Sequence, residues 1–135
     1  ECECSNCFSL SVINWSYLSF NRNAIELLKD NYDKINWIEL CRNQNPNAIE
    51  ILKDNIDKLH FLVASKYLNI CWVLLSGNPN AIELLKDNYN EFHWDNFSAN
   101  PNAIELLKDN QDRINWFYLS RNPSIFKDEP MPELL

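Results

Sequence analysis

Three cysteines at the beginning of the chain form its densest group of reactive side chains: Cys2, Cys4 and Cys7. Thiolates bind Zn²⁺ and iron–sulfur clusters, so the three could hold a metal if another part of the chain supplied a fourth ligand. The spacing lacks the C-x₂-C pairs that are typical of such sites, and a chain end without a ligand is the alternative. We expect no cofactor and no metal site, with these cysteines as the remaining candidates.

Two histidines and a cysteine share one position of a repeated sequence pattern: His60, Cys71 and His93. Elsewhere in the repeat the same position holds Asn14, Asn36 and Asn115. Packed helices lie about 8–10 Å apart, whereas zinc requires each ligand within about 2.3 Å. We therefore interpret these residues as polar side chains that hydrogen-bond to the turn beneath them, and not as a metal site.

Acidic side chains recur at two positions, four residues apart, in each copy of the first part of the repeat. They are Glu26, Glu50, Glu83 and Glu105, followed by Asp30, Asp54, Asp87 and Asp109. This spacing puts both carboxylates on the outer, solvated face of a helix. An active site instead needs a unique, asymmetric group of residues in a cavity. We therefore expect no enzyme and no catalytic residues.

The composition disfavours several further classes of protein. The net charge of −7 argues against nucleic acids and anionic membranes as partners. The single glycine excludes the glycine-rich loops that bind phosphates. The odd number of cysteines, five, favours a reducing, intracellular compartment over secretion. No apolar run reaches the roughly 18 residues of a membrane span, and no signal peptide is visible. Because the first residue is Glu1 and not methionine, we expect a fragment or a processed chain.

Internal repeats dominate the sequence. The segment Asn-Ala-Ile-Glu-Leu-Leu-Lys-Asp-Asn occurs at 23–31, 80–88 and 102–110, and the copy at 47–55 differs only by Ile51. A second block has an Ile-Asn-Trp core at 13–15, 35–37 and 114–116, with altered versions at 59–61, 70–72 and 92–94. Successive cores are 22, 24, 11, 22 and 22 residues apart. The repeat unit is therefore about 22 residues long, with one half-unit between Phe61 and Trp72.

The first block of each unit predicts a short helix. In the copy at 45–55, Asn45 is the expected N-cap and Pro46 the first helical residue. Asn47 and Glu50 could form a capping box instead, which would move the helix start by two residues. The expected inward face contains Ala48, Ile49, Leu52 and Ile56.

The end of that helix and the second block follow from the next residues. We expect Asn55 to end the first helix in a left-handed conformation and Asp57 to cap a second helix. The second helix would direct Ile or Leu, Trp or Phe, and Leu inward. Its spacing leaves open whether it is an α-helix or a 3₁₀ helix.

Such short helices are marginal in water, so neighbouring units must bury one another's apolar faces. We therefore predict an all-α solenoid of about 22-residue repeats, each with two short helices, over residues 13–126. The cysteine-containing segment 1–12 would precede it and a C-terminal tail, 127–135, would follow it. At the half-unit, either a first block is missing or residues 57–70 form one longer helix, and the array should bend there.

Two further positions have a structural interpretation. The tryptophans at repeat spacing are expected to be core residues and not a stacking platform for RNA bases. Cys41 stands where other units have serine, and we interpret it as a small buried replacement for the hydroxyl. The corresponding serines are Ser19, Ser65, Ser76, Ser98 and Ser120.

The repeated pattern resembles a known group of sequences. The unit Asn-Pro-Asn-Ala-Ile-x-Leu-Leu…Ile-Asn-Trp…Leu-Ser-x-Asn-Pro is similar to the short repeats of giant DNA virus proteins of the mimivirus type, over about residues 13–126. The resemblance implies a virus-encoded repeat protein in the host cytoplasm or the virion, without implying any functional residue. Leucine-rich repeat variants are similar in architecture only.

Positions that vary between units indicate where a partner would bind. The candidates are Tyr17, Tyr32, Glu39, Tyr89, Asp95, Asn96, Gln111, Phe117 and Tyr118. If they face solvent, they form a row along one side of the stack, although Ile38, Val73 and Leu74 at the same positions could be core residues. We expect a non-catalytic scaffold that binds a host or viral protein. The alternatives are a structural or assembly component of a virion and a metal-binding module at the N-terminal cysteines.

Overall fold

The computed structural model describes residues 12–63, 70–88 and 92–126. Within these ranges the chain forms α-helices and short 3₁₀ turns and no strand, so the all-α prediction is confirmed. The described residues cover most of the predicted repeat domain, and of the two predicted end segments they include only Val12. No described helix is long and apolar enough to cross a membrane.

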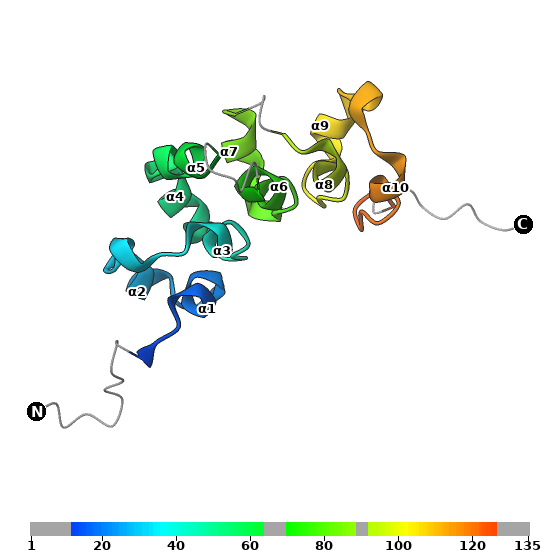
Figure 1. The fold of residues 1–135 in the computed structure, drawn as a ribbon. Helices are drawn as coiled ribbons and strands as arrows, with labels where there is room; N and C mark the ends of the chain where they lie inside the picture. The colour runs from blue at the N-terminus through cyan, green and yellow to red at the C-terminus, as the bar shows by residue number, and fades with distance from the viewer. Residues whose placement is uncertain (1–11, 64–69, 89–91, 127–135) are drawn as a thin grey trace, which may run out of the picture.

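The helices form two rows that follow one curved path (Figure 1). The inner row contains α1 (Trp15–Phe20), α3 (Trp37–Cys41), α6 (Ile70–Ser76), α8 (Trp94–Ser98) and α10 (Trp116–Leu119). The outer row contains α2 (Ile25–Lys29), α4 (Pro46–Asp54), α7 (Ile82–Lys86) and α9 (Ile104–Lys108). Each inner helix packs against the next one along its row. We call an inner helix and the outer helix that follows it a unit, and α10 begins the last described unit.

An asparagine begins most helices of the inner row. Asn14 Oδ1 accepts hydrogen bonds from two backbone N–H groups of the first turn of α1, at 3.0 and 3.2 Å. Asn36 and Asn115 cap α3 and α10 in the same way. These residues supply acceptors for N–H groups that have no partner within the helix. The prediction that Asp57 is a cap is wrong, because it lies in the first turn of its helix.

Asparagines also begin and end α4. Asn45 is its N-cap, as predicted, and accepts from the N–H of Asn47 at 2.9 Å. The prediction for Asn55 is wrong, because its φ of −131° lies outside the left-handed region. Instead, Asn55 Nδ2 donates to the carbonyl of Ile51 at 2.9 Å, which satisfies a carbonyl at the helix end without a change of backbone handedness. The same bond is made by Asn31, Asn88 and Asn110.

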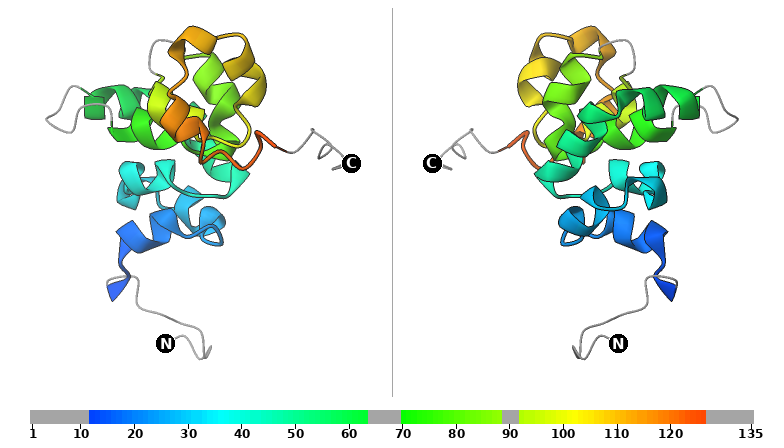
Figure 2. Two further views of the ribbon diagram at one scale, coloured as in Figure 1. Left: turned by 90° about the vertical axis from the view of Figure 1, so that its right-hand side faces the viewer. Right: turned by 90° about the vertical axis from the view of Figure 1, so that its left-hand side faces the viewer.

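The half-unit of the sequence is an inserted helix. α5 (Ile56–Val63) follows α4 and packs against α6, and it projects beyond the two rows (Figure 2). In regular units a 3₁₀ turn takes its place, as in η2 (Tyr32–Lys34) and η5 (Gln111–Arg113), before an α-helix of the inner row. The predicted longer helix over 57–70 includes residues 64–69, which lie outside the described residues. The inner row changes direction at α6, where the sequence predicts a bend (Figure 1).

The apolar core lies between the two rows. Its centre is formed by fully buried leucines, among them Leu28, Leu40, Leu52, Leu75 and Leu85. The predicted inward face of α4 is confirmed, since Ala48, Ile49 and Leu52 are buried and Ile56 is half-buried. The repeated glutamates and aspartates are exposed on the outer helices, also as predicted. Some of these glutamates pair with lysines three residues later, in Glu26–Lys29, Glu83–Lys86 and Glu105–Lys108.

The burial of the tryptophans depends on their place along the inner row. Trp72, in the middle, is 1% exposed, whereas Trp116 in the last described unit is 64% exposed. The half-buried Trp15, Trp37 and Trp94 pack against the core. Basic residues that precede the next inner helix cover two of these rings: Lys34 Nζ lies 5.0 Å from the ring centre of Trp15, and Arg113 Cζ lies 5.3 Å from that of Trp94. The prediction of a core residue is therefore wrong for Trp116.

Buried asparagines join successive units, and we call Asn43, Asn78, Asn100 and Asn122 the asparagine ladder. Each is at most 2% exposed and donates its Nδ2 to a carbonyl near the end of the preceding inner helix. The acceptors are Ser19 at 2.9 Å, Cys41 at 3.0 Å, Ser76 at 2.9 Å and Ser98 at 3.0 Å. From Asn78 onward, each also donates to the carbonyl of the previous ladder residue, at 2.7–3.1 Å. Each Oδ1 accepts from the N–H two residues later.

Loss of one ladder side chain should strongly destabilise the protein. Asn100→Ala removes the donor to the buried Ser76 carbonyl, one of the two donors to the Asn78 carbonyl, which keeps the Ala81 N–H, and the acceptor for the Asn102 N–H. We therefore expect the free energy of unfolding to fall by about 2–4 kcal/mol. Asn102→Ala is the matched control, because its Nδ2 bond to the Pro79 carbonyl is exposed and should contribute about 1 kcal/mol or less. Urea denaturation followed by circular dichroism measures both values. Equal losses in the two variants would contradict this role of the ladder.

Candidate interaction surface

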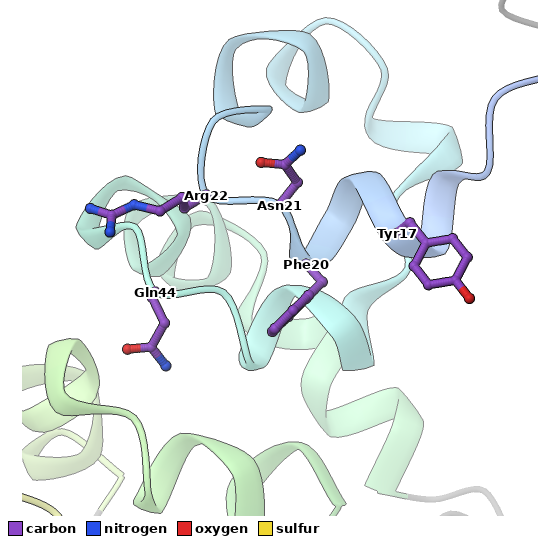
Figure 3. A pocket seen from close by; sticks show the side chains of 5 residues that line it. All are labelled: Tyr17, Phe20, Asn21, Arg22 and Gln44. Atoms are coloured by element: carbon purple, nitrogen blue, oxygen red, sulfur yellow. The ribbon is translucent and has the colours of Figure 1, made fainter.

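A groove runs along the inner row of helices. Three adjoining hollows of about 400, 440 and 310 Å³ form it, and Phe20 lines all of them. We define the groove by Tyr17, Phe20, Glu39, Arg42, Gln44, Leu74, Gly77 and Asn96. Figure 3 shows the hollow nearest the first unit, where Tyr17 and Phe20 project from α1 and Gln44 lies opposite. Because four successive units contribute residues to it, the groove is longer than any single helix of the row.

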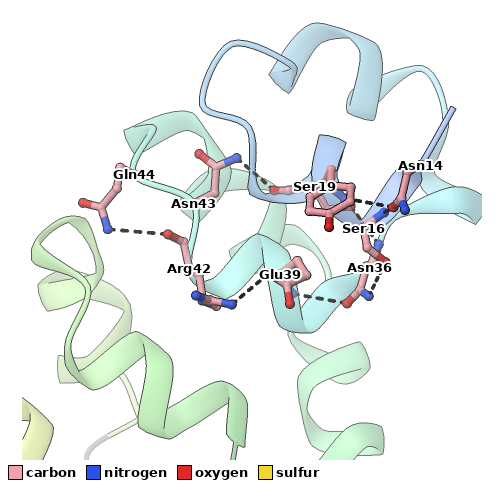
Figure 4. A network of polar contacts seen from close by, with 9 residues as sticks. Asn14, Ser16, Ser19, Asn36, Glu39, Arg42, Asn43 and Gln44 are labelled. Atoms are coloured by element: carbon pink, nitrogen blue, oxygen red, sulfur yellow. Dashed lines mark hydrogen bonds and ion pairs between the residues drawn. The ribbon is translucent and has the colours of Figure 1, made fainter.

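Phe20 and Arg42 form the centre of the groove. The Phe20 side chain is large and apolar, yet the residue is 45% exposed. The Arg42 guanidinium lies 5.1 Å from the ring centre, within the range of a cation–π contact. Glu39 Oε2 accepts from Arg42 Nη1 at 3.2 Å (Figure 4), which orients the guanidinium. An arginine has five N–H donors, so this ion pair leaves others for a bound molecule.

The far part of the groove is formed by α6, α8 and the loop after α6. Leu74 and Asn96 line it, and Asn96 Nδ2 is held by the Val73 carbonyl at 2.9 Å. Gly77, the single glycine, is exposed at its floor. A Cβ at this position would lie 3.7 Å from the nearest atom, which is an ordinary contact. The fold therefore tolerates a side chain at Gly77, and its absence keeps this part of the groove open.

The structure brings some of the predicted partner residues together and separates others. Tyr17, Glu39 and Asn96 line the groove. Asp95 is used within the array, because its Oδ1 accepts from Asn115 Nδ2 at 2.7 Å. The remaining candidates that the structure describes lie elsewhere: Tyr32 and Gln111 begin 3₁₀ turns, and Phe117 and Tyr118 belong to the last described unit. Tyr89 lies outside the described residues.

The sequence interpretation missed the position that contributes most to the groove. Phe20, Arg42 and Gly77 directly follow the serine position of their units, and the same position holds Ala99 and Arg121 in the later ones. The residue at this position thus varies in size and in charge, from phenylalanine and arginine to glycine and alanine. This variation, between neighbours that hardly change, is the signal that could have identified the position.

None of the proposed metal ligands form a site in the part of the chain that the structure describes. No group of three His, Cys, Asp or Glu side chains there could hold an ion, and Cys2, Cys4 and Cys7 lie outside it. His93 makes no side-chain bond to the first turn of α8, and its Nδ1 is buried without a hydrogen-bond partner. The prediction that His93 bonds to a turn is therefore wrong for its side chain. The side chain of His60 is not described.

Two buried thiols meet between the second and third units. Cys41 and Cys71 are 0% and 1% exposed and form no disulfide. The predicted role of Cys41 as a small buried residue is confirmed by this burial. A side-chain hydrogen bond with Cys71, together with burial, raises the pKa of the Cys41 thiol. Both effects favour its neutral form.

Comparisons with protein-family models, curated proteins and solved structures find no match to this chain. A function for the protein must therefore be inferred from the chemistry of the groove.

Cys41 should make stability depend on pH in the alkaline range. Its pKa is raised in the folded chain, so its contribution to the free energy of unfolding is complete below the ordinary thiol pKa of about 8.5 and is lost as the pH rises through the folded pKa. A Cys71→Ala background isolates the effect of burial. We compare Cys71→Ala with the double variant Cys41→Ala/Cys71→Ala. The difference in their free energies of unfolding should become smaller as the pH rises above about 8.5. A difference that is constant or grows in this range, measured by urea denaturation with reductant, would contradict the assignment.

Proposed function

We propose that this protein is a non-catalytic solenoid scaffold that binds a segment of a partner protein along the groove. The observation that carries the proposal is the continuity of the groove over successive units, with exposed Phe20 and Arg42 at its centre. Aromatic residues and arginine are the side chains that most often dominate protein–protein interfaces. A partner segment in an extended conformation would follow such a surface from unit to unit.

The chemistry of the lining supports a peptide as the ligand. Phe20 and Leu74 offer apolar contacts, while Gln44 and Asn96 carry amide groups that match the hydrogen-bonding groups of a backbone. Arg42 adds a guanidinium that pairs with a carboxylate or a carbonyl. The repeated carboxylates of the outer helices are exposed, and none of them lines the three hollows of the groove. The resemblance to giant DNA virus repeats supports a host or viral protein as the source of the segment.

The single glycine offers a sharp test of this proposal. We expect a library of displayed peptides, selected on the native chain, to yield ligands whose affinity falls at least about tenfold in Gly77→Trp, because the indole fills the groove. Gly77→Ala is the matched control and should bind almost as tightly as the native protein, since a Cβ meets only ordinary contacts there. Fluorescence anisotropy with the selected peptides measures both affinities.

Two results would overturn the proposal. One is a set of selected peptides that bind native protein and Gly77→Trp equally well, which would locate binding elsewhere. The other is a selection from which no peptide with measurable affinity emerges. Circular dichroism and urea denaturation of each variant distinguish loss of binding from loss of folding.

A further inference from the structure

The groove has a local excess of positive charge although the chain is acidic. Among the described residues, the charged side chains that line its three hollows are two arginines, Arg22 and Arg42, and one carboxylate, Glu39. The chain as a whole has a net charge of −7. A bound anionic group would therefore meet attraction in the groove that the rest of the chain does not offer on average.

Arg42 is positioned to bind such a group. Its side chain is 50% exposed, and the contacts with the Phe20 ring and with Glu39 fix the position of the guanidinium (Figure 4). Among the described residues, only Glu39 accepts a hydrogen bond from this guanidinium, and it does so from Nη1. The other N–H donors remain for a ligand, and a carboxylate can accept two of them in parallel.

The surroundings of Arg42 match the rest of a peptide. Phe20 and Leu74 line the same hollow of about 310 Å³ and supply apolar surface beside the guanidinium. Asn96 lines it as well, and its bond to the Val73 carbonyl uses Nδ2. None of the described residues donates to Asn96 Oδ1, so this atom can accept a backbone N–H of a bound segment. The hollow thus combines one cationic, one apolar and one amide-binding element.

We propose that the partner segment is acidic, with an aspartate or glutamate that binds Arg42 and a neighbouring apolar side chain that packs against Phe20 and Leu74. This inference rests on the proposed function, because it names the chemistry of the segment that occupies the same groove. A single-stranded nucleic acid also combines negative charge with flat rings. It carries a phosphate at every nucleotide, however, and two arginines in a chain of net charge −7 do not match such a backbone.

Selection of displayed random peptides on the native chain, followed by measurement on Gly77→Trp, tests this inference. Peptides that lose at least about tenfold in affinity for Gly77→Trp are groove ligands. We expect an acidic residue close in sequence to an apolar one among them. Replacement of that acidic residue by its amide should weaken binding to the native chain at least about tenfold. This comparison uses only native protein, so it does not depend on the folding of any variant.

A second comparison assigns the effect to Arg42. Arg42→Gln should weaken binding of the acidic peptide at least about tenfold and should hardly change binding of its amide counterpart. Arg121→Gln is the matched control and should leave both affinities unchanged. Arg121 holds the same position in its unit and lies over an aromatic ring, with Cζ 4.8 Å from the ring centre of Phe117, but it lines none of the three hollows. Fluorescence anisotropy measures all four affinities.

The outcomes separate this inference from the proposed function. Groove ligands without an acidic residue, or acidic groove ligands that bind Arg42→Gln as tightly as the native chain, would overturn the inference and leave the groove as a peptide site. Ligands that bind Gly77→Trp and native protein equally well, or a selection without any ligand, would overturn both. Circular dichroism of Arg42→Gln and Arg121→Gln verifies that each variant is folded.

Discussion

The rest of this structure depends on a hydrogen bond from a buried asparagine amide to the unit before it. The helices are short, and helices of this length are marginal in water without neighbours. Where one turns into the next, backbone carbonyls are buried and need donors. Asn78, Asn100 and Asn122 each supply donors to two such carbonyls while their own Oδ1 holds the loop after the helix. One side chain thus fixes the loop within a unit and the spacing between units.

This arrangement explains how the array accommodates an insertion. α5 interrupts the sequence period, yet Asn78 bonds to Cys41 and Asn43 as its counterparts bond to their neighbours. The ladder therefore sets the order of the units in space independently of the number of residues between them. Among the described residues, hydrogen bonds between units do not use a side chain at the position that follows the serine, which holds Phe20, Arg42 and Gly77. Residues at this position can therefore vary between units, although Arg42 lies over the Phe20 ring.

The sequence predicts the helical class, the repeat length, the inward face of α4 and the cap at Asn45, because each follows from local spacing. The prediction for Asn55 is wrong because an asparagine amide can end a helix without a left-handed residue. The prediction for Asp57 is wrong because inner helices such as α3 are capped by the asparagine of the Ile-Asn-Trp core. The hydrogen bonds between units cannot be predicted from the sequence of one unit, because their donor and acceptor are up to 37 residues apart. The groove cannot be predicted from one unit either. Sequence variation identifies Tyr17, Glu39 and Asn96, but only the stacking of units brings these residues close to Phe20 and Arg42.

Hydrogen exchange of the asparagine side-chain amides, followed by NMR, tests the central role of the ladder most directly. We expect the Nδ2 protons of Asn78, Asn100 and Asn122 to exchange at least about tenfold more slowly than those of the exposed Asn23, because they open only when units separate. We also expect the three ladder residues to exchange at similar rates. Ladder amides that exchange as fast as Asn23 would contradict a central role for these bonds.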